Sequence, residues 1–279
     1  MTAPLTAQGT ISRTADCHVG HRISARGGGP RDRWNSGLWR QKSGLLGEPA
    51  QLQDGDRTFV GDQRLLKILV ANRKGGCGKT TVATQLAGAL AASGHTCWLA
   101  DADRQRSSLG WLACRPAEAP PIAALDWTKE IGKPPKGEGF LVIDAAAGLH
   151  GKRAVEMVKL ADLLILPMLP SAFDEGVTRR FLDRIKKLRR IATGRMPVGI
   201  VGNRIRGGTH SAGGFERFVA GLGAPIVARV RDSQVYVQSA ATGVSVFDAR
   251  GRRWRALQVE WYPLLAFVEH NGTRLTDAA

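Results

Sequence analysis

A loop rich in glycine and lysine, residues 74–81, carries the clearest chemistry in this sequence. It follows an apolar run, Leu65–Ala71, and precedes a stretch rich in alanine and leucine, so it joins an expected strand to an expected helix. Glycines let successive N–H groups curl around an anion, at the positive end of the following helix. Lys79 would then reach the terminal phosphates of a nucleotide, and the Thr80 hydroxyl would hold Mg²⁺. The expected nucleotide-binding residues of this loop are Lys74, Gly75, Gly76, Cys77, Gly78, Lys79, Thr80 and Thr81.

Acidic residues follow two further apolar runs. Asp101 and Asp103 come directly after the run Thr96–Ala100, and Asp144 ends the run Phe140–Asp144. Hard carboxylate oxygens suit Mg²⁺, so we expect Asp144 and Asp103 to complete a metal site with Thr80. For the pair at 101 and 103, a helix cap and a solvated acid remain the alternative.

Stepping along the chain from residue 65, short apolar runs alternate with helical stretches, which indicates an α/β fold with a doubly wound, mostly parallel sheet. Loops at the carboxyl ends of the strands would place the polar motifs at one edge of that sheet. Residues 1–63, with glycine, serine and arginine but few periodic apolar positions, predict a disordered basic extension before a domain at 64–279. The other expected strands are Leu163–Pro167, Val198–Asn203 and Ile226–Val230, and the expected helices are 79–93, 151–160, 174–192, 212–221, 233–242 and 254–269.

The loop at 74–81 departs from the general phosphate-loop pattern, because Arg73 replaces the first glycine and a second lysine, Lys74, follows it. In this form it resembles the deviant Walker A motif of the ParA/MinD superfamily of P-loop ATPases. The resemblance implies ATP and Mg²⁺ as cofactors and a homodimer, closed by ATP, in which Lys74 reaches the partner's nucleotide. It also implies that Asp103 positions the hydrolytic water and that Asn203 contacts the adenine ring.

Two departures from the family pattern bear on hydrolysis. Arg104 stands where the family usually has proline, and Ala145 and Ala146 follow Asp144 in place of threonine and proline. The resemblance implies slow hydrolysis without a partner, and a binding scaffold that does not hydrolyse ATP stays open.

Positive charge is concentrated in the second half of the chain. The formal net charge is +16, and residues 151–279 carry twenty-one Lys and Arg against eleven Asp and Glu. This asymmetry favours a polyanionic partner, for which DNA bound through its phosphates is the leading candidate. A solvated basic surface is the alternative. The residues expected to contact DNA are Arg184, Lys187, Arg250, Arg252 and Arg253.

Composition narrows the remaining classes. The four cysteines lack C-x-x-C spacing, which argues against a disulfide framework, a zinc site and the cluster-binding branch of the superfamily. The sequence contains no run of about 18 apolar residues, so we expect no stable membrane insertion. The first residues lack the pattern of a secretory signal. We therefore expect a cytoplasmic, nucleoid-associated protein.

These features predict a partition ATPase of the ParA type. It would bind DNA non-specifically in its ATP state, and hydrolysis, promoted by a ParB-like or cargo-adaptor protein, would drive segregation or positioning of plasmid or chromosomal DNA. The alternative is a MinD-like or other cargo-positioning ATPase that acts through a membrane or a protein partner.

Overall fold

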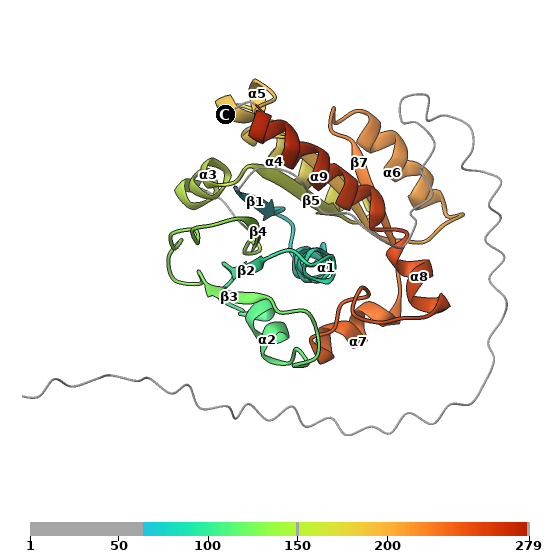
Figure 1. Cartoon of the computed structure of the whole chain (residues 1–279). Helices are drawn as coiled ribbons and strands as arrows, with labels where there is room; N and C mark the ends of the chain where they lie inside the picture. Colours follow the sequence, from blue (N-terminus) through green and yellow to red (C-terminus); the bar gives the residue numbers. More distant parts are fainter. Residues whose placement is uncertain (1–63, 149–150, 278–279) are drawn as a thin grey trace, which may run out of the picture. The chain divides into compact units, whose positions relative to one another are not determined.

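The computed structural model describes residues 64–148 and 151–277. The expected extension at 1–63 lies outside the described residues. The domain that follows is built on a seven-stranded sheet of order β3-β2-β4-β1-β5-β6-β7, in which every pairing is parallel (Figure 1). This confirms the doubly wound α/β fold. The strands are β1 (Leu65–Val70), β2 (Cys97–Asp101), β3 (Ala123–Asp126), β4 (Gly139–Asp144), β5 (Leu163–Met168), β6 (Val198–Ile205) and β7 (Ile226–Arg231).

Helices cover both faces of the sheet. The cluster on one face takes buried side chains from α1, α2, α7, α8 and α9, and the cluster on the other face takes them from α3, α4 and α6. The helices are α1 (Lys79–Ala92), α2 (Ser107–Ala113), α3 (Gly151–Leu160), α4 (Ala172–Ile185), α5 (Arg189–Ala192), α6 (His210–Ala220), α7 (Gln234–Thr242), α8 (Arg252–Gln258) and α9 (Tyr262–Asp277). None of the helices within the described residues is long and apolar enough to cross a membrane.

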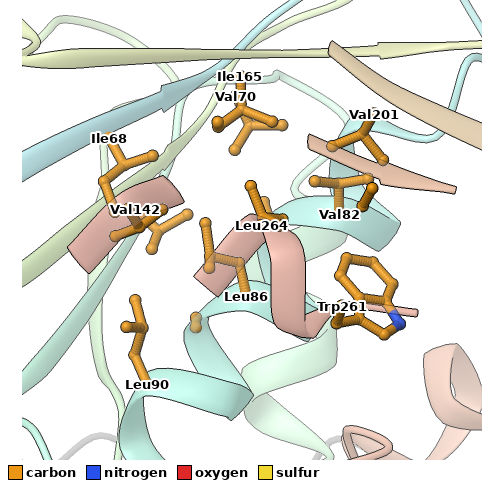
Figure 2. Close-up of a cluster of buried hydrophobic side chains, with 14 of the residues drawn as sticks. Ile68, Val70, Val82, Leu86, Leu90, Val142, Ile165, Val201, Trp261 and Leu264 are labelled. Carbon is orange, nitrogen blue, oxygen red and sulfur yellow. The ribbon is translucent and has the colours of Figure 1, made fainter. Parts of the chain in front are cut away.

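Strand β1 shows how the sequence builds this core. Alternate side chains of a strand point to opposite faces of the sheet, so Ile68 and Val70 join one cluster and Leu69 joins the other. Figure 2 shows Ile68 and Val70 beside Leu86 of α1 and Leu264 of α9. Both faces of the central strands are therefore apolar, as a covered parallel sheet requires.

The first helix, α1, is fixed to the turn that precedes α8. The Gln85 side chain accepts a hydrogen bond from the Val246 backbone N–H at 2.8 Å. One turn later a Cβ on Gly88 would lie 2.3 Å from the Cβ of Ser245, so only glycine permits this approach. The same turn is held from the end of α2, because Arg115 makes two bonds to the Asp248 carboxylate, at 2.8 and 2.9 Å.

A buried carboxylate lies at the edge of the sheet opposite to the phosphate loop. Asp162, between α3 and β5, is 2% exposed. Its oxygens lie 2.7 Å from the Lys67 ammonium, 3.3 Å from Arg64 and 3.5 Å from Arg190. The Lys67 backbone N–H also donates to this carboxylate, at 3.1 Å. Cations and an amide thus surround the charge.

Two long expected helices are each divided in the structure. The stretch expected as one helix at 174–192 is α4 and α5, because Leu188 adopts an extended conformation between them. The stretch expected at 254–269 is α8 and α9, and Pro263 explains the break. Proline lacks an N–H and is tolerated only in the first turn of a helix, where α9 places it.

Two short elements were not expected at all. Strand β3 is a four-residue edge strand without a buried side chain, so it lacks the apolar run that reveals a covered strand. Helix α2 follows the acidic loop at 101–106 and buries only Ser108 and Trp111. Its seven residues are too few to show helical periodicity.

Candidate nucleotide and metal site

The phosphate loop connects β1 to α1, as the sequence predicts. Gly78 has a φ of 94°, a left-handed conformation in which the loop turns into the helix. Lys79 begins α1 and is 6% exposed, and its ammonium donates to the Lys74 carbonyl at 3.1 Å. The Cys77 thiol donates to the same carbonyl at 3.2 Å. The lysine that is expected to reach the phosphates is therefore already folded across the loop.

Asp144 ends β4 beside this loop, with both oxygens buried. Its Oδ2 accepts hydrogen bonds from the Thr80 hydroxyl at 2.7 Å and from the Ser108 hydroxyl at 2.6 Å. Its Oδ1 is a buried atom to which the described residues offer no hydrogen-bond donor. Burial raises the pKa of Asp144 to about 6, against the lowering effect of the two hydroxyl groups.

The residues around Asp144 fit a magnesium ion. A buried carboxylate oxygen without a protein donor lies next to a threonine hydroxyl, and both are the hard oxygen ligands that Mg²⁺ prefers. Within the described ranges no group of three or more His, Cys, Asp and Glu side chains could hold a metal by itself. Magnesium bound here would take its further ligands from water and the phosphate oxygens of a nucleotide, as is usual for this ion.

The acid that ends β2, Asp101, and the acid two residues later, Asp103, have separate roles in the structure. Asp101 accepts the N–H groups of Ser108 and Leu109, at 2.9 and 3.1 Å, and thereby caps the start of α2. It also accepts the N–H of Asp103 at 2.9 Å. The alternative of a helix cap therefore describes Asp101.

Asp103 faces the loop that follows β4. Its Oδ2 accepts the Ala147 N–H at 3.1 Å, and its Oδ1 accepts the Gln105 N–H at 3.0 Å. Among the described residues, no hydrogen bond joins Asp103 to Thr80 or Asp144. The structure thus places Asp103 between two loops at the site rather than on the oxygens of Asp144, a place from which it could orient water.

Lys74 lies in the field of an acid of its own chain. Asp174, near the start of α4, is 3% exposed, and burial raises its pKa while the charge of Lys74 acts in the opposite direction. The Lys74 N–H donates to the Asn72 side chain at 3.2 Å. The amide of Asn72 donates in turn to the Pro167 carbonyl and the Thr178 hydroxyl, at 2.8 and 2.9 Å. Asn72 thus ties the start of the phosphate loop to β5 and α4.

Asn203, near the end of β6, reaches the phosphate loop. Its amide donates to the Cys77 carbonyl at 3.0 Å. A Cβ on Gly78 would lie 1.9 Å from its Nδ2 atom, so the contact requires glycine there. The structure brings Asn203 to the expected site, with its side chain engaged by the loop.

The residues expected to contact DNA are exposed but lie in two places. Arg184 is on α4 and Lys187 follows it, whereas Arg252 and Arg253 begin α8 and Arg250 precedes it. Because α4 and α8 bury side chains in the clusters on opposite faces of the sheet, the structure does not join the two groups into one patch.

Ser108 and Asn72 are site residues that the sequence did not reveal. Ser108 lies seven residues beyond Asp101, and only the turn into α2 brings its hydroxyl to Asp144. Asn72 lies two residues beyond the end of β1, at the carboxyl edge of the sheet. That position, where polar side chains of α/β proteins gather, was the one available signal.

Comparison with known proteins agrees with this geometry. Residues 68–246 match the model of the CobQ/CobB/MinD/ParA nucleotide binding domain. A maintenance of carboxysome distribution protein A from Halothiobacillus neapolitanus is 28% identical over 204 residues, which cover 69% of this chain and 93% of the relative.

Solved structures share the fold at lower identity. The MinD cell division protein of Aquifex aeolicus aligns with a TM-score of 0.56 at 18% identity, over 72% of this chain and 97% of that chain. A McdA variant of Cyanothece in complex with ATP aligns with a TM-score of 0.56 at 16% identity, over 74% and 96%. The family model spans both the phosphate loop and the acid at the end of β4. The chain therefore belongs to the CobQ/CobB/MinD/ParA family of nucleotide-binding proteins.

Proposed function

We propose that this protein is a dimerising ATPase that binds Mg²⁺ and ATP and uses hydrolysis to position a large cargo in the cytoplasm. The observation that carries the proposal is the Asp144 carboxylate, which shares one oxygen between Thr80 and Ser108 and keeps the other without a donor in the described structure. A buried acid in this state, beside a phosphate loop, is well suited to hold a cation.

Each residue then has a defined task. The N–H groups of the loop and the Lys79 ammonium hold the phosphates, and Thr80 and Asp144 hold the metal. When bound, magnesium neutralises the charge that develops on the phosphates. Asp103 orients water from its place between the loops. Lys74, whose charge now faces Asp174, turns to the nucleotide of the partner subunit.

The cargo and the surface that carries it follow from different observations. The relative from Halothiobacillus neapolitanus is named for carboxysome distribution and is matched over 93% of its length. This favours positioning of a large protein assembly through a cargo adaptor. Segregation of plasmid or chromosomal DNA through a ParB-like partner is the second candidate, favoured by a ParA relative from Rhizobium radiobacter that is 32% identical over 124 residues.

In both cases we propose non-specific DNA, bound in the ATP state, as the surface on which the dimer is held, which makes the protein nucleoid-associated. The exposed basic residues that would contact phosphates are Arg184, Lys187, Arg250, Arg252 and Arg253. The MinD-like alternative, action at a membrane surface, is supported less well, because α9 buries Leu264 and Val268 in the core, beside Trp261, which directly precedes the helix.

The test compares variants of the two loop lysines. Lys74→Ala should abolish hydrolysis while the protein still binds ATP, and Lys79→Ala should weaken nucleotide binding about tenfold or more, because it removes a charge-assisted contact. Phosphate release and the binding of a fluorescent ATP analogue are measured, with Lys133→Ala as an exposed control. Normal turnover by Lys74→Ala would reject the assigned mechanism.

A second measurement tests whether DNA is the surface on which the dimer is held. Binding to random-sequence duplex DNA, compared with ATP, with ADP and without nucleotide across a salt series, should be tight and salt-sensitive only with ATP. Replacing Arg252 and Arg253 by alanine should reduce it. Equal binding in all three nucleotide states would argue against a DNA-carried switch.

A further inference from the structure

A small apolar pocket lies between α3 and α4, next to the start of the phosphate loop. Its volume is about 40 Å³, which exceeds the roughly 10–15 Å³ that one water molecule needs. It is far smaller than the ~300–1,000 Å³ of sites for small-molecule ligands. A space of this size fits the tip of one aliphatic side chain. Its apolar lining consists of Ala154, Val155, Phe181, Ile185 and Leu188.

Three arginines complete the lining of this pocket: Arg73, Arg180 and Arg184. All three residues are exposed. Across residues 64–148 and 151–277 the structure gives none of them a carboxylate partner. By contrast, Arg229 and Arg231 of β7 have Glu216 and Glu260 beside them. The pocket therefore combines an apolar floor with a rim of positive charge that the described chain leaves uncompensated.

We propose that this pocket docks an acidic segment of a partner protein, with one aliphatic side chain inserted between α3 and α4 and flanking carboxylates on Arg73 and Arg180. The charge of the rim selects the acidic groups, since guanidinium groups pair well with carboxylates. The apolar floor selects the anchor, which the phosphates and sugars of DNA do not supply. A hydrophobic anchor within a charged rim is a common arrangement for peptide recognition.

The pocket is connected to the nucleotide site through the chain on both of its sides. Arg73 directly precedes Lys74, and its carbonyl accepts the Gly148 N–H at 3.1 Å, in the loop that follows Asp144. On the other side, Thr178 of α4 bonds to Asn72. A carboxylate on Arg73 would thus restrain the first residue of the phosphate loop. This effect on nucleotide turnover rests on the proposed function, whereas the docking itself does not.

The experiment uses the full chain without nucleotide and an array of fluorescent peptides. Each peptide carries one central leucine, isoleucine, valine, methionine or phenylalanine between aspartate and glutamate residues. Matched peptides carry serine at the centre and have the same charge. We expect saturable binding, measured by fluorescence anisotropy, of at least one aliphatic peptide and a loss of roughly tenfold or more with serine.

Variants test whether the binding occurs at this pocket. Arg73→Ala and Arg180→Ala should each weaken peptide binding about tenfold, while the exposed control Arg189→Ala should not. Val155→Phe fills the pocket but keeps all three arginines, so it should weaken the aliphatic peptides and bring them to the level of the serine peptides. Circular dichroism confirms that each variant is folded.

Several outcomes would overturn the docking proposal. These are failure of the whole array to bind, equal binding of aliphatic and serine peptides, and unchanged binding by Arg180→Ala. If Arg180→Ala instead abolishes duplex DNA binding, or ATP-dependent dimerisation, the surface belongs to DNA or to a second copy of this chain.

The coupling is tested separately, by the rate at which a fluorescent ATP analogue leaves the protein saturated with peptide. A changed rate supports the connection through Arg73, and an unchanged rate rejects it while the docking stands. Failure to bind any nucleotide would instead reject the proposed function, and peptide binding would be unaffected.

Discussion

Two buried aspartates at opposite edges of one sheet are compensated in different ways. Asp162 is surrounded by Lys67, Arg64 and Arg190, so its charge is matched within the protein. Asp144 has only two hydroxyl donors on one oxygen and, among the described residues, none on the other. The first arrangement stabilises the fold. The second keeps a charge that the folded chain does not neutralise, which is what a site for a cation requires.

The largest expected effect comes from removing Asp162, the aspartate whose charge is matched within the protein. Asp162→Ala should lower the free energy of unfolding by about 3–5 kcal/mol, because it leaves the largely buried Lys67 ammonium without its partner. Urea denaturation measures the loss. The exposed acid Asp183 provides the control, since Asp183→Ala should change stability by less than about 0.5 kcal/mol. Equal effects of the two variants would contradict the role of Asp162.

The second prediction concerns the uncompensated edge and its dependence on pH. The pKa of Asp144 is raised from 3.8 to about 6, so the folded protein holds this proton more tightly than the unfolded chain. Its stabilising contribution is full below about pH 4 and is lost as the pH rises through 6. The loss amounts to about 3 kcal/mol at neutral pH, since each unit of pKa corresponds to about 1.4 kcal/mol.

Asp144→Asn removes this titration and keeps an oxygen that accepts hydrogen bonds. Relative to the original protein, the variant should therefore gain stability between pH 4 and pH 7, in denaturation experiments without magnesium or nucleotide. With magnesium and ATP the order should reverse, because only the carboxylate gains from the bound ion. A stability difference that is independent of pH would contradict the assigned pKa.

The smallest expected effect concerns the Ser108 hydroxyl, which donates to Asp144. Ser108→Ala removes one of the two donors to Asp144. It should raise the Mg²⁺ concentration at the midpoint of nucleotide binding about tenfold. A titration of Mg²⁺ against a fluorescent ATP analogue measures the midpoint. Ser107→Ala, at an exposed neighbour, is the control. An unchanged midpoint in Ser108→Ala would mean that the hydroxyl only fills space.

The sequence allowed the sheet and the phosphate loop to be predicted because their signals are local. Apolar runs such as Leu65–Ala71 mark covered strands, and the spacing of Lys74 and Lys79 belongs to one continuous loop. Asp162 shows the limit. A single acid between an expected helix and an expected strand does not reveal that Lys67 and Arg190, far away in the sequence, converge on it.

The wrong boundary at 174–192 and the two missed site residues have a common physical cause. Helical periodicity continues through 174–192, yet the extended conformation of Leu188 separates α4 from α5. Likewise, Ser108 and Asn72 are ordinary polar residues in the sequence, and only tertiary contacts bring them into the site. Such contacts depend on how elements pack, which periodicity along the chain does not encode.

The attachment of α1 to the turn before α8 has a mechanical consequence. Gln85 grips the Val246 amide, and Gly88 lets Ser245 approach until the two backbones are in close contact. Arg250 and its neighbours are therefore attached, through this turn, to the helix that begins at the phosphate loop. A tilt of α1 when the loop closes on phosphates would therefore displace this turn and the arginines that follow it.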